Sequence, residues 1–81
     1  MLGTTEGKEM TDITIVEIFG IKMENRYASL LRVVCDKEVH WDLRMQACGK
    51  LCKAGATSAL EYIVRDKSLH WDLRQKAMDH L

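Results

Sequence analysis

The pentapeptide His40-Trp41-Asp42-Leu43-Arg44 occurs a second time, unchanged, as His70-Trp71-Asp72-Leu73-Arg74. The two copies are 30 residues apart, and eleven of the 22 positions in residues 30–51 are identical to their counterparts in residues 60–81. A fixed period between roughly 20 and 50 residues is the signature of stacked supersecondary units. The sequence therefore predicts an architecture made from two copies of one unit, although a repeat by itself specifies no chemistry.

Apolar residues follow each pentapeptide at helical spacing. Leu43, Ala47 and Leu51 stand at positions i, i+4 and i+8, which places them on one face of a helix and predicts that they point inward. The second copy has Leu73, Ala77 and Leu81 at the same positions. We predict helices over residues 26–36, 41–53, 56–66 and 71–81. Their short connections indicate antiparallel helical hairpins, stacked side by side.

The segment before the repeats predicts a further helix over residues 11–23, capped by Thr11 or Asp12. Its β-branched residues make a strand the alternative, and Gly20 weakens a helix by about 1 kcal/mol. Residues 1–10 lack periodicity and are predicted to be a flexible tail. The predicted fold class is therefore all-α: a short α-solenoid of about two helical hairpins plus an N-terminal capping helix, in one domain over residues 11–81.

Composition narrows the function classes. Lys and Arg together number 12, as do Asp and Glu, so the formal net charge is zero, which argues against a general attraction to nucleic acids. The apolar stretch over residues 13–21 is too short to span a bilayer. Cys35, Cys48 and Cys52 form no CxxC pair and are expected to be free thiols. We expect a cytoplasmic protein, because free thiols persist in reducing compartments.

The two units resemble HEAT-like repeats, in particular the short kind of about 30 residues found in phycobilisome-lyase-type repeat proteins. The shared pattern is an Asp that ends the first helix, an acidic-aliphatic-Arg sequence that opens the second, and then Ala and Leu on its inner face. His-Trp stands where an acidic cap and a proline are common in that family. The resemblance implies that Asp36 pairs with Arg44 and Asp66 with Arg74, and that both aspartates accept hydrogen bonds from loop amides.

Trp41 and Trp71 open equivalent helices and have two interpretations. In the first, each ring packs over the end of the preceding helix as a hydrophobic staple. In the second, two tryptophans one repeat apart form an aromatic ledge for a partner peptide, because tryptophan is favoured at binding hot spots. His40 and His70 are interpreted as loop-end or cap residues, since equivalent residues about 10 Å apart cannot share one metal ion.

The sequence contains no Gly-rich phosphate loop, no GxSxG and no HExxH motif. We therefore predict a non-enzymatic protein-binding or scaffold module without a cofactor or a metal. The alternative is a nucleic-acid-binding HEAT-like module, in which basic residues gather on one side: Arg26, Arg32, Lys37, Arg44, Lys50 and Lys53. A pigment- or cofactor-handling relative of the lyase accessory proteins ranks last, because the sequence indicates no roomy pocket.

The C-terminal helices are the predicted contact surface. An apolar stripe with no polar capping helix after it tends to associate, so a homodimer, or docking onto a larger protein, is expected through residues 56–81. The predicted protein-binding residues are Trp41, Trp71, Leu73, Ala77, Met78 and Leu81.

Overall fold

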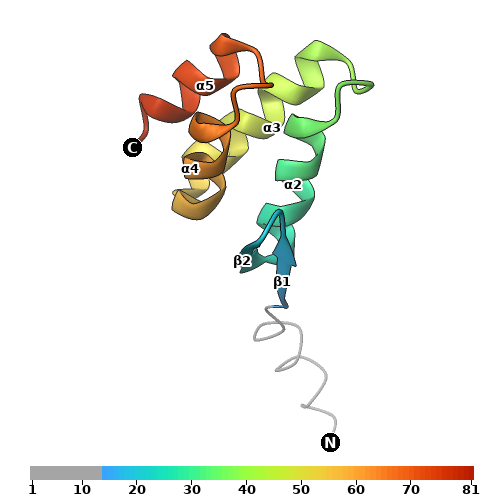
Figure 1. Ribbon diagram of the computed structural model, residues 1–81, viewed down its shortest axis with the longest axis vertical. Helices are drawn as coiled ribbons and strands as arrows, with labels where there is room; N and C mark the ends of the chain where they lie inside the picture. Colours follow the sequence, from blue (N-terminus) through green and yellow to red (C-terminus); the bar gives the residue numbers. More distant parts are fainter. Residues whose placement is uncertain (1–13) are drawn as a thin grey trace, which may run out of the picture.

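The computed structural model describes residues 14–81 and is mostly helical (Figure 1). Two antiparallel strands precede four helices. The elements are β1 (Ile15–Ile18), β2 (Ile21–Glu24), α2 (Asn25–Cys35), α3 (Trp41–Ala54), α4 (Thr57–Arg65) and α5 (Trp71–Met78). The predicted tail over residues 1–10 lies outside the described residues, as do residues 11–13 of the predicted N-terminal helix.

The prediction of a helix over residues 11–23, and with it an all-α fold, is wrong in the described part. Strands β1 and β2 pair antiparallel there, with Val16 opposite Met23 and Glu17 opposite Lys22. The two-residue turn between them has positive φ at both positions, 53° at Phe19 and 78° at Gly20, as a tight hairpin turn requires. The β-branched residues and Gly20, which weakened the helix prediction, are the reason that the strand alternative prevails.

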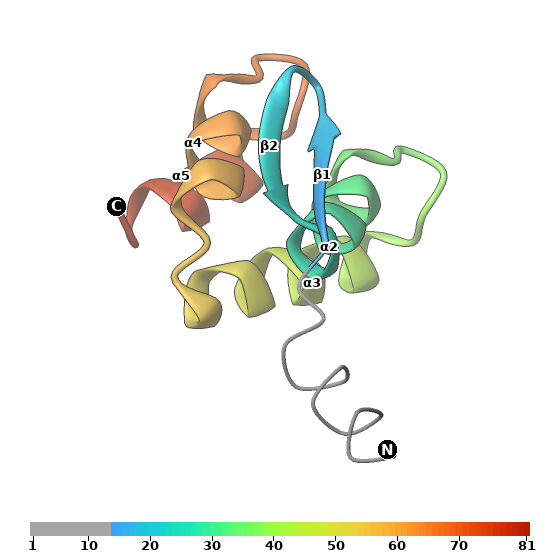
Figure 2. The ribbon, with the colours of Figure 1, turned by 90° about the horizontal axis from the view of Figure 1, so that it is seen from below.

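The helices form two hairpins, α2–α3 and α4–α5, that lie side by side (Figures 1 and 2). Helix α3 packs against α5, and α2 touches α4. Gly55 ends α3 in the left-handed conformation, with φ of 67°, as its position in the sequence indicates. Helix α5 ends at Met78, before the predicted end at Leu81.

Both helical hairpins are closed by the same turn. The Asp36 carboxylate accepts a hydrogen bond from the Glu38 amide at 2.9 Å, and the Asp66 carboxylate accepts one from the Ser68 amide at 3.0 Å. The next helix then begins with the same cap in both hairpins. His40 Nδ1 accepts the Asp42 amide at 3.1 Å, and His70 Nδ1 accepts the Asp72 amide at 3.0 Å. The interpretation of both histidines as caps is confirmed, and the repeat extends to individual hydrogen bonds.

Equivalent leucines of the two repeats differ in burial. Ala47, Leu51, Leu73 and Ala77 lie in the interior, as predicted. Leu43 is 53% exposed and Leu81 is 58% exposed, so the prediction that they point inward is wrong. Leu73 lies in the first turn of the helix α5 that packs on α3, where the Cys48 thiol donates to the Leu73 carbonyl at 3.8 Å, and its side chain is fully buried, whereas that of Leu43 remains exposed.

The β-hairpin lies across α2 and α4 rather than on the end of the stack (Figure 2). Ile18 and Met23 enter the hydrophobic core. The Phe19 ring stacks on the Tyr62 ring of α4, with the two centroids 4.7 Å apart and the planes inclined by 11°. The segment predicted to cover the N-terminal side of the first hairpin therefore contacts both helical hairpins instead.

Candidate protein-binding surface

The predicted ion pairs of the repeat are replaced by bonds to main-chain carbonyls. Arg44 Nε donates to the Val34 carbonyl at 2.9 Å, and Arg74 Nε donates to the Val64 carbonyl at 3.1 Å. These carbonyls belong to the last turns of α2 and α4, where no further helical amide follows to satisfy them. The prediction that Asp36 bonds Arg44 and Asp66 bonds Arg74 is therefore wrong, although both aspartates do bind loop amides.

Three aromatic rings form a row where the two hairpins meet. The His70 ring lies edge-on to the Trp41 ring, with centroids 5.0 Å apart, and beside the Trp71 ring at 6.2 Å. We call these three residues the aromatic row. Trp71 is 65% exposed, so the staple interpretation is wrong for it. Trp41 is 36% exposed, because His70 and the Arg44 guanidinium, whose Cζ lies 5.8 Å from the ring centroid, cover part of its ring.

Charge beside the aromatic row is negative. The Asp72 carboxylate lies 3.9 Å from His70 Nδ1, and the Asp42 carboxylate lies 3.9 Å from His40 Nδ1. The guanidinium of Arg44 is directed into the protein, where the residue is only 8% exposed. The row therefore offers exposed aromatic surface next to carboxylates, which suits a partner with basic or aromatic side chains.

The remaining residues of the predicted contact surface separate into two groups. Leu73 and Ala77 are fully buried, so the prediction that they touch a partner is wrong. Met78 and Leu81 are exposed. On the neighbouring helix α4 the exposed residues include Ser58 and Glu61, so polar side chains share this side of the second hairpin. The C-terminal side is therefore less apolar than the sequence pattern indicated.

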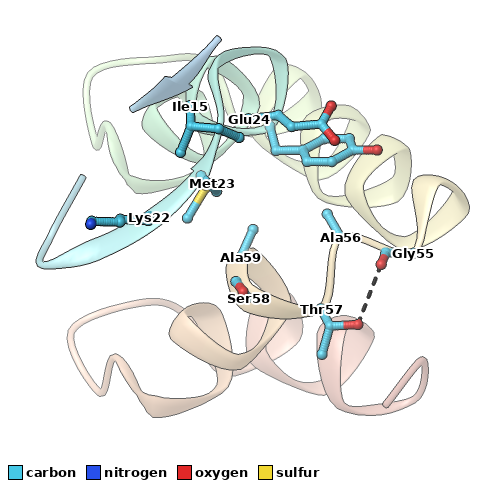
Figure 3. A pocket seen from close by; sticks show the side chains of 10 residues that line it. Ile15, Lys22, Met23, Glu24, Gly55, Ala56, Thr57, Ser58 and Ala59 are labelled. Carbon is cyan, nitrogen blue, oxygen red and sulfur yellow. Dashed lines mark hydrogen bonds between the residues drawn. The ribbon is translucent and has the colours of Figure 1, made fainter. Parts of the chain in front are cut away.

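A groove of about 320 Å³ separates β2 from the start of α4 (Figure 3). Met23 and Ala59 face each other across it, and its lining also includes polar side chains, those of Lys22, Glu24, Tyr27, Thr57 and Ser58. Glu24 is paired with Arg26 Nε at 2.7 Å, and the Thr57 hydroxyl bonds the Gly55 carbonyl at 3.3 Å.

A second pocket collects positive charge. Lys50, Lys53, Lys76 and His80 line a space of about 420 Å³ between α3 and α5. Of the basic residues predicted to gather on one side, Lys50 and Lys53 therefore do so. Arg44 is excluded, because it is buried and bonded to Val34.

The three cysteines are free thiols, as predicted. Burial raises the pKa of the Cys48 thiol to about 12 and that of the Cys35 thiol to about 11. Burial also raises the pKa of Cys52. The Cys48 and Cys52 thiols donate weak hydrogen bonds to carbonyls of α5, of Leu73 at 3.8 Å and of Lys76 at 3.7 Å. Neutral, buried thiols are poor nucleophiles, so these residues serve the contact between α3 and α5.

Asp66 has more hydrogen-bond partners than its repeat counterpart Asp36. The Ser68 hydroxyl bonds it at 2.7 Å and the Tyr62 hydroxyl at 2.9 Å, in addition to the Ser68 amide. The hydrogen bonds from Ser68, and then the one from Tyr62, lower the pKa of Asp66. Burial, and then the hydrogen bond to Asp66, raises the pKa of Tyr62 to about 12. A carboxylate with a lowered pKa stabilises the fold above its unfolded pKa of about 4, and this contribution is lost as pH falls through the folded pKa.

We therefore expect Asp66→Asn to lower the free energy of unfolding at pH 7 by about 1–2 kcal/mol, and Asp36→Asn by about 0.5 kcal/mol. Urea denaturation at pH 7 and at pH 3 measures both. The deficit of Asp66→Asn should shrink at pH 3, because the wild-type carboxylate loses its advantage there. Equal losses for the two variants at pH 7 would contradict this assignment.

Comparison of the chain with models of protein families, with curated proteins and with solved structures found no match. Within residues 14–81, no group of three or more His, Cys, Asp or Glu side chains is placed to hold a metal ion. In the same part of the chain, no helix combines the length and the apolar character needed to cross a membrane.

Proposed function

We propose that this protein is a non-enzymatic protein-binding module whose aromatic row contacts a peptide segment of a partner. The observation that carries the proposal is the exposure of Trp71 beside His70 and Trp41 (centroids 6.2 and 5.0 Å from His70). Exposed tryptophan is costly for a soluble surface and is enriched among the residues that dominate binding energy. Because both hairpins contribute to the row, their packing fixes its geometry.

The partner segment has a definite chemistry in this proposal. Asp72 lies beside the row and supplies negative charge, and the face of the Trp71 ring can receive a cation. A peptide with an arginine or lysine next to an aromatic or aliphatic residue therefore fits best. The cationic side chain then lies between the carboxylate and the indole, and the apolar residue covers the remaining ring surface.

The two hairpins belong, in this proposal, to the HEAT-like class, and the helical part is a short α-solenoid. The support is the equivalence of the turns: aspartate to loop amide, histidine to helix start, and arginine to the preceding helix end, each bond recurring 30 residues later. Solenoids bind partners along surfaces of this repeated kind. A cytoplasmic location is part of the proposal and is supported by the three free thiols.

Selection from a phage-displayed peptide library, followed by titration of the enriched peptides, tests the binding proposal. We expect the peptides to carry the basic and apolar pair, and Trp71→Ala to weaken their binding by at least about tenfold. Ile15→Ala is the matched control, since Ile15 is also a large exposed apolar residue but lies on β1. Circular dichroism should show both variants folded.

Two results would contradict the proposal. One is a selection without enriched peptides. The other is a set of peptides that lose affinity with Ile15→Ala and keep it with Trp71→Ala. The second result would place the site in the groove beside β2 (Figure 3).

Nucleic-acid binding is the second candidate, favoured by the basic pocket of Lys50, Lys53, Lys76 and His80. Its weakness is the zero net charge of the chain. A mobility shift of duplex DNA that fades steeply as salt rises from about 50 to 200 mM, and that is lost in Lys53→Glu, would favour this function over the first.

A further inference from the structure

We propose that the outer face of the first helical hairpin binds the same face of a second copy of this chain, forming a symmetric dimer. The face consists of Leu30 and Val33 on α2, Val39 in the turn and Leu43 on α3. We call these four residues the outer face, because the groove that they line is formed by α2, the following turn and α3, without a residue of α4 or α5. It is distinct from the aromatic row and does not depend on the function proposed above.

The repeat itself shows that this face is built for burial. The four counterparts of its residues in the second hairpin are all buried: Leu60, Ile63, Leu69 and Leu73. In the first hairpin the same positions are still aliphatic, but Leu43 is 53% exposed and the others are only half-buried. They line a groove of about 330 Å³ together with Ala47, Gln46 and Lys50.

The opposite side of the stack, on α4, has polar residues at positions where the equivalent residues of α2 are apolar. Ala28 and Leu31 of α2 are fully buried, whereas their counterparts in α4 are Ser58 and Glu61, both exposed. A head-to-tail stack of two copies would press Glu61 against the apolar groove, and burying an unpaired carboxylate is costly. Such a contact would also continue into an open filament.

A symmetric contact avoids this cost. In a twofold dimer the same patch meets itself, so the patch must hold both a protrusion and a recess. The outer face has both, because Leu43 is 53% exposed and also lines the groove. Lys50 is the only charged residue of the groove. Two antiparallel helical hairpins that pair through apolar faces form a four-helix bundle, a stable and common arrangement.

The size of the face sets the expected affinity. Helix α3 has 14 residues. It is therefore about 21 Å long, and two adjacent helices about 10 Å apart present a patch of roughly 20 by 20 Å. A patch of this size buries roughly 800 Å² in total from the two copies, which is less than a standard specific interface, so we expect a weak, reversible dimer with a dissociation constant of about 100 micromolar or more.

Sedimentation equilibrium of the full chain, from micromolar to millimolar concentration, tests the proposal. We expect the mass to rise from 9.3 kDa to twice that value and to stop there. Leu43→Glu should weaken the dimer at least about 100-fold, because the carboxylate is buried twice in a symmetric contact. Met78→Glu, an exposed residue at the other end of the stack, is the control and should leave the dimer intact.

Thermal unfolding separates the remaining outcomes. The unfolding temperature of a dimer rises with protein concentration, and that of Leu43→Glu should not. A monomeric wild type whose unfolding temperature falls with Leu43→Glu would show that other residues of the chain cover the face. A monomeric wild type whose unfolding temperature is unchanged by Leu43→Glu would indicate that a different protein binds the face. Either result would overturn the proposal, as would assembly beyond a dimer or dissociation by Met78→Glu.

Discussion

Truncation of Leu73 to alanine should lower the free energy of unfolding by about 3 kcal/mol, whereas Leu43→Ala should change it by less than about 0.5 kcal/mol. The two leucines occupy the same place in the same pentapeptide. They differ in environment, because Leu73 is fully buried against α3 and Leu43 is 53% exposed. The difference between the variants therefore measures the contact between hairpins and not the local sequence.

Urea denaturation at low protein concentration, at which the chains are monomeric, measures this difference. A domain of this size has a small reserve of stability, so Leu73→Ala can unfold it altogether. Leu73→Val is the milder variant and should cost about 1 kcal/mol. Equal losses for Leu73→Ala and Leu43→Ala would mean that the two hairpins do not pack as described.

The second large effect is expected from the arginines. Arg44→Met removes the guanidinium that bonds the Val34 carbonyl but retains most of the aliphatic side chain, and should cost about 2–3 kcal/mol. Arg74→Met should cost about 1–2 kcal/mol, because Arg74 is more exposed and its bond to Val64 is longer. Denaturant unfolding measures both losses.

A double-mutant cycle separates this arrangement from an ion pair. Asp36 bonds the Glu38 amide and Arg44 bonds the Val34 carbonyl, so the two side chains serve different partners. The effects of Asp36→Asn and Arg44→Met should therefore add to within about 0.5 kcal/mol. A coupling energy of 1 kcal/mol or more between the two substitutions would instead indicate that Asp36 and Arg44 interact directly, as the family resemblance implied.

The helical part of the fold could be predicted from the sequence because its signals are local. The 30-residue period, the stripe of Ala47 and Leu51 and Gly55 at the end of α3 together place the helix boundaries to within a few residues. The histidine caps were also predictable, since a side chain before a helix has few other partners.

Two features depend on tertiary contacts in addition to the local sequence, which for residues 15–24 left helix and strand as alternatives. Strands β1 and β2 are stabilised by packing on α2 and α4, including the stack of Phe19 on Tyr62, residues 43 positions apart. The burial of Leu43 depends on whether another element covers its side of α3, and the pentapeptide is identical at Leu43 and Leu73, so the sequence does not distinguish the two leucines.

The candidate site was predicted in part. Two tryptophans one repeat apart indicated an aromatic ledge, and the structure adds His70 between them. The placement of Leu73 and Ala77 in the contact surface was wrong because an apolar stripe on the last helix does not reveal which of its residues α3 covers. Cys48 and Cys52 were the signal that could have shown it, since small side chains one turn apart let two helices approach closely.

The β-hairpin has a consequence for how the molecule comes apart. Tandem repeats that touch only their neighbours can fray one unit at a time. Here β2 touches both α2 and α4, and the Phe19 ring in the turn stacks on the Tyr62 ring of α4. Detaching the second hairpin therefore also breaks its contacts with the strands that pack on the first, so the two units should exchange their amide protons and melt in one cooperative transition.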